Sequence, residues 1–380
     1  MNNKWIAAWG CPIAKPYRNI AQWVKDTTVR FNIFMTVDGS ALRFHFSNLF
    51  GEHQAEITHA SVAAYMGDRA IDTARMATIT FDGEQIGKMA AGEDICSDEI
   101  PFNFKAGETL SVSLYFGEFT QMTTAHQNGG RFMEKWVVSG DYTHTSQLDI
   151  NDNSDADSYP FIHTIDALCS DDCYSIIAFG DSITAQSWPD RLSRRINEMG
   201  KNNVAVVRKA ISGSRVLREY PCTAYQTYGP KGDARFEREV LRAGVKKVLI
   251  LHGINDLIHP ERNGSIFRPI SHMPNAQQLI EGLMYYINTA HANGIEVYLS
   301  PILPFEGWRT YNEEKEAIRV EVNEWIYNEA PVEGVLPYET ALQDPENPKR
   351  FLPQFDAGDH LHPSDAGAQQ IADSTPKEWL

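Results

Sequence analysis

The spacing of hydrophobic residues changes about 170 residues into the chain. Before that point, short segments such as Val29–Val37 and Ala41–Ser47 alternate apolar and polar residues, and no helical period of useful length occurs. Further candidate strands are Ser61–Tyr65, Ala77–Phe81, Leu110–Phe116 and Phe161–Leu168. Turns rich in glycine and aspartate separate the strands, and Asp38-Gly39 predicts a hairpin between the first two. The pattern predicts a β-sandwich of jelly-roll type over residues 1–168.

From Tyr174 onward, short apolar strands alternate with helical segments. The predicted strands are Tyr174–Gly180, Asn203–Val207, Lys247–Leu251 and Ile295–Leu299. The predicted helices are Pro189–Met199, Asp233–Ala243, Asn275–Ala292 and Asn312–Asn328, with a terminal helix that begins at Pro363-Ser364-Asp365. Such alternation indicates an α/β domain, over residues 172–380, in which helices cover both faces of a parallel sheet. The chain of 380 residues is long enough for two such domains.

Composition narrows the range of partners. Hydrophobic content of 42% and charged content of 22% are ordinary for a globular protein. The net charge of −16 argues against nucleic acid and anionic membranes as partners, because both require basic patches. It favours a neutral substrate, although a local basic cluster such as Arg262 and Arg268 could bind an anion. The sequence leaves the oligomeric state open.

Cysteine usage and the start of the chain bear on location. The five cysteines are scattered and odd in number, which favours thiols in a reducing compartment. Cys169 and Cys173 are spaced as zinc ligands could be, but no second pair accompanies them. The first ten residues contain no apolar stretch of signal-peptide length, and no run approaches a membrane span. We therefore expect a cytoplasmic protein, an expectation that an export signal removed beforehand would reverse. The acidic segment Asp149–Ser158 lacks the glycine and glutamate of a calcium loop, so a solvated loop is favoured there.

Ser182 is the strongest candidate for a reactive group. It lies in Gly180-Asp-Ser-Ile-Thr184, directly after the apolar strand that begins at Tyr174. Open α/β sheets bind their ligands at the carboxyl ends of the strands, so a serine here is placed to act as a nucleophile. Serine attacks only when a base removes its proton.

The far end of the chain offers that base. His362 and Asp359 are three residues apart in Asp359-His-Leu-His-Pro363, so the carboxylate could orient the imidazole toward Ser182. His360 is an alternative base, and Asp356 is an alternative orienting carboxylate. A metallohydrolase would instead use all four of these side chains as ligands, but it needs further ligands from elsewhere and leaves Ser182 without a task.

These residues resemble the motifs of the GDSL/SGNH hydrolases. Gly180-Asp-Ser-Ile-Thr184 resembles the first motif of that superfamily, and Asp359-x-x-His362 resembles its last. Between them, Gly213 in Ala210-Ile-Ser-Gly-Ser-Arg215 resembles the glycine block, and Gly253-Ile-Asn-Asp256 resembles the asparagine block. The four blocks occur in family order. The resemblance implies a three-layer α/β/α hydrolase domain and a serine esterase that needs no cofactor and no metal.

The resemblance also implies three oxyanion donors. They are the backbone N–H of Ser182, the backbone N–H of Gly213 and the side-chain amide of Asn255. Asp181 and Asp256 are interpreted as structural, because each can hydrogen-bond to the backbone near its own motif.

The resemblance implies a short-chain ester as substrate, chiefly an acetyl ester on a small molecule, an oligosaccharide or a plant polysaccharide such as xylan. The whole chain is similar to two-domain esterases of xylan-degrading systems in Trp5-Ile-Ala-Ala-Trp9, Arg43–Gly51 and Gly358–Pro363. Trp188, Tyr220, Tyr225, Tyr228 and Trp308 could stack on sugar rings or pack in the core. A lysophospholipase or lipase with the same triad is the alternative, although Ile254–Pro274 is more polar than a lipase lid. A sugar-binding protein with an inactive hydrolase half is a further alternative, which the intact motifs disfavour.

The first domain has two possible roles. It is either a carbohydrate-binding module or one wall of the active-site cleft, to which the polar segment Thr123–Arg131 could contribute. The short junction at residues 169–173 favours the wall.

Overall fold

The structure is a computed structural model that describes residues 3–16, 23–126, 134–148, 159–262 and 266–380. The chain divides into two compact units. The first comprises Met1–Ser175 with Ile196–Val207, and the second comprises Ile176–Arg195 with Arg208–Leu380. The division of folding domains at residues 168–172 stays a prediction.

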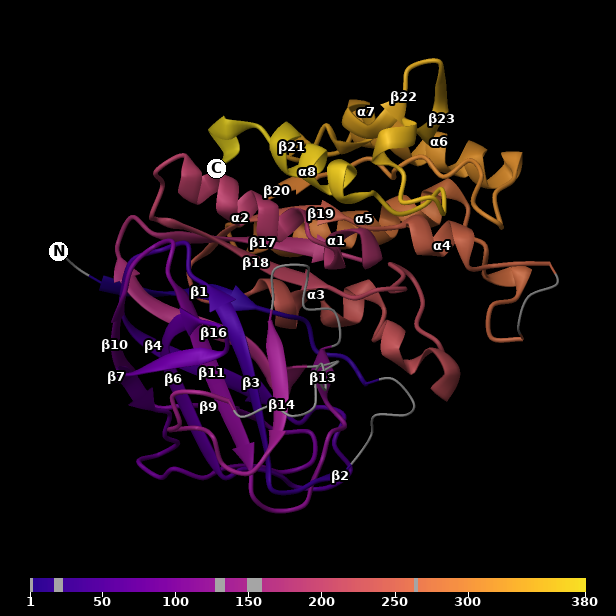
Figure 1. The fold of residues 1–380 in the computed structure, drawn as a ribbon. Helices are drawn as coiled ribbons and strands as arrows, with labels where there is room; N and C mark the ends of the chain where they lie inside the picture. The colour runs from indigo at the N-terminus through magenta and orange to yellow at the C-terminus, as the bar shows by residue number, and fades with distance from the viewer. Residues whose placement is uncertain (1–2, 17–22, 127–133, 149–158, 263–265) are drawn as a thin grey trace. The chain divides into compact units, whose positions relative to one another are not determined.

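The first unit is built from antiparallel strands (Figure 1). One sheet has the order β1-β16-β4-β10, with β9 also paired to β4, and the other has the order β14-β3-β11-β6-β7. The strands of the first sheet are β1 (Asn3–Gly10), β4 (Gly39–Ser47), β9 (Asp94–Cys96), β10 (Ile100–Phe104) and β16 (Ile162–Ser170). Those of the second are β3 (Thr27–Phe34), β6 (His59–Gly67), β7 (Ala70–Thr78), β11 (Thr109–Phe116) and β14 (Lys135–Ser139). Three two-stranded sheets join β2 (Trp23–Val24) to β12 (Thr120–Gln121), β5 (Ala55–Ile57) to β8 (Gly87–Met89), and β13 (Ala125–His126) to β15 (Tyr159–Pro160).

Alternate residues of the two large sheets meet in one apolar core. Phe31 and Val112 enter it from the second sheet, and Phe44 and Ile165 enter it from the first. All four side chains are fully buried, which is the expected fate of the apolar positions in an alternating strand. The antiparallel strands thus follow the sequence pattern, while the jelly-roll topology stays a prediction.

The predicted hairpin at Asp38-Gly39 is wrong. Strand β3 ends at Phe34 and pairs with β11 and β14, whereas β4 begins at Gly39 and pairs with β16, β10 and β9. Met35 and Val37 between them are fully buried in the core. The chain therefore crosses from one sheet to the other here, because burying these apolar side chains takes precedence over the local turn signal.

The parallel sheet lies mainly in the second unit, although the first residues of β17 and β18 belong to the first. Its order is β18-β17-β19-β20-β21, and β20 pairs in parallel with both β19 and β21. The strands are β17 (Tyr174–Gly180), β18 (Val204–Ala210), β19 (Val245–Leu251), β20 (Glu296–Leu299) and β21 (Gly334–Val335). A separate hairpin joins β22 (Gln343–Asp344) to β23 (Asn347–Phe351).

Helices alternate with these strands along the chain (Figure 1). The α-helices are α1 (Ser182–Ala185), α2 (Trp188–Glu198), α3 (Gly232–Val240), α4 (Ile254–Ile258), α5 (Ala276–Ala292), α6 (Glu313–Asn328), α7 (Tyr338–Leu342) and α8 (Asp365–Ser374). Short 3-10 helices are η1 (Thr223–Tyr228), η2 (Ile270–His272), η3 (Pro353–Phe355) and η4 (Lys377–Trp379). The predicted starts of α5, α6 and α8 are confirmed, because the side chains of Asn275, Asn312 and Ser364 accept hydrogen bonds from the first turns.

The structure also bears on the predictions about membrane spans, cysteines and two polar segments. Among the described residues, no helix is long and apolar enough to cross a membrane. All five cysteines lie in described segments and form no disulfide there. The acidic segment Asp149–Ser158 and residues 127–131 of the proposed cleft-wall segment lie outside the described residues.

Candidate active site

Ser182 is the first residue of α1, at the point where strand β17 ends. Gly180 closes the strand, and a Cβ atom there would lie 2.2 Å from the carbonyl oxygen of Leu251 in β19. Only glycine therefore allows the two strand ends to approach so closely. Asp181 caps the helix by accepting a hydrogen bond of 3.1 Å from the backbone N–H of Ile183. The turn leaves Ser182 half-buried at the carboxyl end of the strand.

The structure brings Ser182, His362 and Asp359 into one hydrogen-bonded series. The distance from Ser182 Oγ to His362 Nε2 is 2.8 Å, and that from His362 Nδ1 to Asp359 Oδ2 is 2.6 Å. The second carboxylate oxygen of Asp359 accepts from the backbone N–H of His362 at 2.8 Å and of Leu361 at 3.0 Å. With Asp359 ionised, Nδ1 carries the imidazole hydrogen, and Nε2 accepts from the serine hydroxyl.

The surroundings of Asp359 keep it ionised. Partial burial raises the pKa of this carboxyl, but hydrogen bonds from the ring and backbone of His362 and from Leu361 lower the pKa by more. The net pKa is below the ordinary value of an aspartate. An ionised carboxylate is what the orientation and stabilisation of an imidazolium require.

The alternative pair, His360 and Asp356, forms a second dyad on the same loop. The distance from His360 Nδ1 to Asp356 Oδ2 is 2.6 Å, and the backbone N–H of His360 donates to Asp356 Oδ1 at 3.0 Å. His360 adopts a left-handed backbone conformation with φ of 62°. Of the two imidazoles, His362 is the one hydrogen-bonded to Ser182.

The predicted oxyanion donor Asn255 is hydrogen-bonded to the residue that follows the predicted donor Gly213. The side-chain amide of Asn255 in α4 donates to the carbonyl oxygen of Ser214 at 3.0 Å. The carboxylate of Asp256 accepts from the backbone N–H of Val216 at 2.7 Å and of Leu217 at 3.1 Å. Two consecutive side chains of α4 thereby fix the loop that carries the glycine block. Such fixed donors need no reorganisation when charge develops on a substrate.

Gly213 is required in this loop for two reasons. Its φ of 80° lies in the left-handed region, and a Cβ atom would lie 2.2 Å from the ring of Tyr228. The backbone amides of Gly213 and Ser182 donate no hydrogen bond to the described residues. Both amides are therefore available to a ligand, which is the condition that an oxyanion donor must meet.

Behind the site lie buried carboxyl groups. Burial raises the pKa of Asp181 to about 7 and that of Asp256 to about 6. The guanidinium of Arg235, itself buried, donates to the carbonyl oxygen of Gly180 at 2.7 Å and pairs with Glu239 at 2.6 Å. Asp181 and Asp256 each accept hydrogen bonds from backbone N–H groups, which agrees with their structural interpretation.

The aromatic candidates separate into two groups. Trp188 is fully buried and packs against Tyr338, so the sequence-based option of a place at the mouth is wrong for this residue. Tyr220 is also buried, and its hydroxyl forms a hydrogen bond with His259. Tyr228 lies on Gly213, and Trp308 lies edge-on to His362 with ring centroids 6.4 Å apart.

Sequence reasoning missed two features of this site. The packing of Tyr228 on Gly213 joins residues from different loops, and no local spacing signals it. The Asp356–His360 dyad did carry a signal, because its partners are four residues apart in a loop that already contains Asp359 and His362.

Within the described ranges, no group of three His, Cys, Asp or Glu side chains converges as metal ligands.

Comparison with known families agrees with the fold and the order of motifs. The profile of the GDSL-like Lipase/Acylhydrolase family matches residues 178–370, just over half of the chain. The chain belongs to this family of ester hydrolases. Among curated proteins, no match is found.

Solved structures resemble about half of the chain. One is a catalytic mutant of an acetylxylan esterase from Geobacillus stearothermophilus, which is 19% identical with a TM-score of 0.40 and covers 53% of this chain and 91% of its own. Another is a lipolytic protein of the G-D-S-L family from Desulfitobacterium hafniense, which is 20% identical with a TM-score of 0.38 and covers 53% and 96%. An acylhydrolase from Bacteroides fragilis is 17% identical with a TM-score of 0.37 and covers 52% and 83%.

Proposed function

We propose that the protein is a serine esterase that removes short acyl groups, chiefly acetyl, from a plant polysaccharide such as xylan or from its oligosaccharides. The observation that carries the esterase chemistry is the series of hydrogen bonds from Ser182 Oγ through His362 to Asp359. Each contact is within the range in which a proton can pass between the two heavy atoms.

In the proposed mechanism, Ser182 Oγ attacks the ester carbonyl while His362 Nε2 accepts its proton. Asp359 stabilises the resulting imidazolium through Nδ1–H. The oxyanion accepts hydrogen bonds from the backbone N–H groups of Ser182 and Gly213 and from the amide of Asn255. His362 then protonates the leaving alkoxide, and a water molecule attacks the acyl-enzyme with His362 again as base. This sequence requires no metal and no cofactor.

The substrate class rests on the sequence likeness to two-domain esterases of xylan-degrading systems and on the polar groups around His362. The proposed partners are therefore ester substrates of small or oligosaccharide size, with no nucleic acid or membrane. We infer further that the first unit is a jelly-roll domain and that the chain as given is cytoplasmic.

One observation favours a second candidate, a lysophospholipase or lipase acting on longer acyl esters. In the segment that follows α4, Ile266 has 84% of its surface exposed and Ile270 has 39%. Exposed apolar side chains of this size are suited to contact an acyl chain or a lipid.

The test compares p-nitrophenyl acetate with p-nitrophenyl octanoate for the wild type and Ser182→Ala. We expect a higher kcat/KM for the acetate and a loss of about 10⁴-fold or more in kcat for the variant, because the triad acts as a unit. Preference for the octanoate would support the lipid candidate instead. A Ser182→Ala variant as active as the wild type would remove Ser182 from the mechanism.

A further inference from the structure

We propose that His360 and Trp308 form a subsite that binds the sugar on the leaving-group side of the ester. This inference rests on the proposed function, because it concerns the alcohol that His362 releases. It assigns to the second Asp-His dyad a task that the acyl-transfer mechanism does not give it.

The imidazole of His360, like that of His362, is hydrogen-bonded through Nδ1 to an aspartate of its own loop, although Ser182 is not its partner. The carboxylate of Asp356 accepts from His360 Nδ1 at 2.6 Å, from the backbone N–H of His360 at 3.0 Å and from that of Gly358 at 2.7 Å. These bonds hold His360 at a φ of 62°, which is unfavourable for a residue with a side chain. A side chain that is 52% exposed is thus fixed in one orientation at a cost in backbone strain.

Two consecutive residues of a second loop lie against the two histidines. A Cβ atom on Gly307 would lie 2.7 Å from Cγ of His360, so the ring packs on this glycine. The ring of the next residue, Trp308, lies edge-on to His362 with an interplanar angle of 86°. His360, Trp308 and His362 therefore belong to one local cluster. Because His362 Nε2 protonates the leaving oxygen, the groups that flank it are placed to contact the alcohol part of the substrate.

The hydrogen-bonding groups of this cluster complement a hydroxyl. Asp356 fixes the hydrogen of His360 on Nδ1, so Nε2 is left as an acceptor, and it has no hydrogen-bond partner among the described residues. The indole nitrogen of Trp308 is a buried donor that likewise has no partner in the described chain. A sugar offers hydroxyl groups that both donate and accept, together with a ring face suited to an aromatic side chain. The cluster thus fits a sugar better than an acyl chain.

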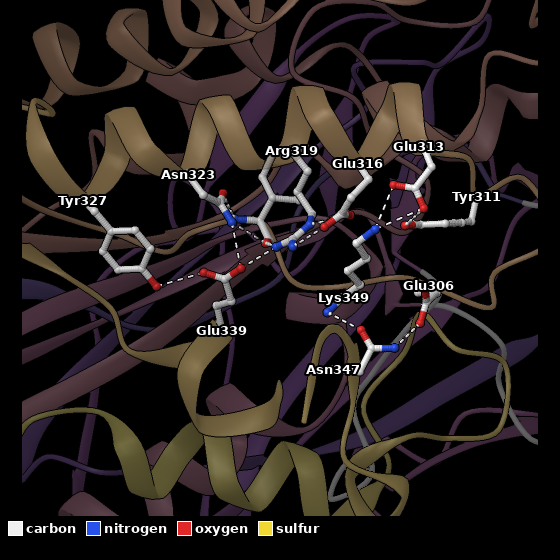
Figure 2. A network of polar contacts seen from close by, with 11 residues as sticks. Glu306, Tyr311, Glu313, Glu316, Arg319, Asn323, Tyr327, Glu339, Asn347 and Lys349 are labelled. Atoms are coloured by element: carbon white, nitrogen blue, oxygen red, sulfur yellow. Dashed lines mark hydrogen bonds and ion pairs between the residues drawn. The ribbon is translucent and has the colours of Figure 1, made fainter. Parts of the chain in front are cut away.

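The loop that carries Trp308 is anchored at its start by α6, whose side chains Arg319 and Asn323 are drawn in Figure 2. The amide of Asn323 accepts from the backbone N–H of Ile302 at 2.8 Å and donates to its carbonyl oxygen at 2.9 Å. Arg319 donates to the same carbonyl oxygen at 3.1 Å and is paired with Glu316 and Glu339. All of these groups are buried.

Glu306, further along the same loop, is anchored by the β22–β23 hairpin. The backbone N–H of Glu306 donates to the carbonyl oxygen of Lys349 at 2.8 Å, and its carboxylate accepts from the amide of Asn347 at 2.5 Å. Lys349 pairs in turn with Glu313 at the start of α6 at 2.8 Å (Figure 2). Gly307 and Trp308 follow Glu306 directly, so they are held at a fixed position. Binding sites on such preorganised segments lose less entropy when a ligand binds.

The test uses two acetyl esters that differ only in the alcohol: p-nitrophenyl acetate and acetylated xylobiose. His360→Asn removes the imidazole, and asparagine tolerates the left-handed backbone conformation that this position requires. We expect the ratio of kcat/KM for acetylated xylobiose to that for p-nitrophenyl acetate to fall by about 5- to 20-fold, chiefly through KM, as for a lost hydrogen bond. Trp308→Phe keeps the ring and removes the donor, and we expect a smaller fall in the same direction.

The matched control is His291→Asn. His291 is another exposed imidazole paired with a carboxylate, that of Glu333 at 3.2 Å, and it lies in the last turn of α5. We expect this variant to leave the ratio unchanged. The inference is overturned if His360→Asn lowers both activities equally, if it changes neither, or if the wild type hydrolyses p-nitrophenyl acetate but not acetylated xylobiose. Failure of the esterase proposal itself gives a different result, because Ser182→Ala would then retain activity on p-nitrophenyl acetate.

Discussion

At the scale of single residues, Gly213 is constrained both by its backbone conformation and by its close contact with Tyr228. Gly294 shares only the first of these constraints. Both Gly213 and Gly294 have a positive φ, 80° and 70°, but a Cβ atom meets the Tyr228 ring only at Gly213 and meets nothing within 4 Å at Gly294. We expect both Gly→Ala variants to lose about 1 kcal/mol of stability from backbone strain. Only Gly213→Ala should also lose kcat, by about 100-fold, because its amide is displaced from the oxyanion.

Thermal unfolding and kcat on p-nitrophenyl acetate measure the two effects separately. Equal kcat values for Gly213→Ala and the wild type, with the variant folded, would remove the Gly213 amide from the oxyanion site. A loss of kcat in Gly294→Ala would show instead that general destabilisation explains the effect.

Asp181 gives a prediction about pH. In the unfolded chain its carboxyl has the ordinary aspartate pKa of 3.8, but burial raises its pKa to about 7 in the folded protein. Between these values the folded state binds more protons, so the contribution of Asp181 to stability is present below pH 4 and is lost as the pH rises toward 7. Asparagine keeps the acceptor for the Ile183 N–H and carries no charge.

We therefore expect Asp181→Asn to gain stability relative to the wild type as the pH rises from 4 to 8, by about 2–4 kcal/mol. Urea unfolding of both proteins at these two pH values measures the change. The exposed residue Asp373 provides the control, and Asp373→Asn should show no comparable gain. A stability difference for Asp181→Asn that is independent of pH would contradict the prediction.

At the scale of elements, the anchor between α6 and the start of the Trp308 loop is tested by two asparagines on one helix. Asn323 makes two hydrogen bonds to the backbone of Ile302 and is buried, whereas the exposed Asn328 donates only to Glu324 one turn earlier. We expect Asn323→Ala to destabilise the protein by about 2–4 kcal/mol, since it leaves the buried backbone N–H of Ile302 unpaired and removes one of the two hydrogen bonds to its carbonyl oxygen. Asn328→Ala should cost less than about 0.5 kcal/mol. Similar losses in urea unfolding would mean that the anchor contributes nothing beyond helix propensity.

The elements also show where sequence patterns predict structure and where they do not. The helices that begin at Asn275, Asn312 and Ser364 were predictable, because capping residues and apolar periodicity agree within each segment. The hairpin at Asp38-Gly39 was not, because two strands that alternate alike can join different sheets, and only the shared core decides between them.

The same contrast holds for the candidate site. Ser182, Asp359 and His362 lie in short motifs whose spacing predicts their roles before their distances are known. Tyr228 and Trp308 reach Gly213 and His362 from other loops, so their contacts depend on the folded sheet. The sequence indicates the reacting groups better than it indicates the walls around them.

At the scale of the whole molecule, the first unit is not continuous in sequence, because it includes the segment Ile196–Val207. It follows Ser182 in the sequence, yet it clusters with the first unit. Within that unit, the backbone N–H of Asp38 donates to the carbonyl oxygen of Asn202 at 3.2 Å, and Asn203 donates through its side chain to Asp172 at 3.2 Å. Ala205 in β18 belongs to the apolar core of the β-sheets.

A fragment of residues 172–380 would lose Asp38, the partner of Asn202 just before β18, and the apolar core to which Ala205 belongs. Removing the first 171 residues would expose Ala205, which is buried in the full chain, and would leave the carbonyl oxygen of Asn202 without the N–H of Asp38. We expect the fragment to be less stable than the full chain and prone to aggregate, because a sheet edge with apolar side chains would face solvent. Size-exclusion chromatography and thermal unfolding of the fragment beside the full chain measure this. A monomeric fragment that unfolds at the same temperature as the full chain and retains kcat on p-nitrophenyl acetate would show instead that residues 172–380 form an independent domain, with the first unit dispensable for the chemistry.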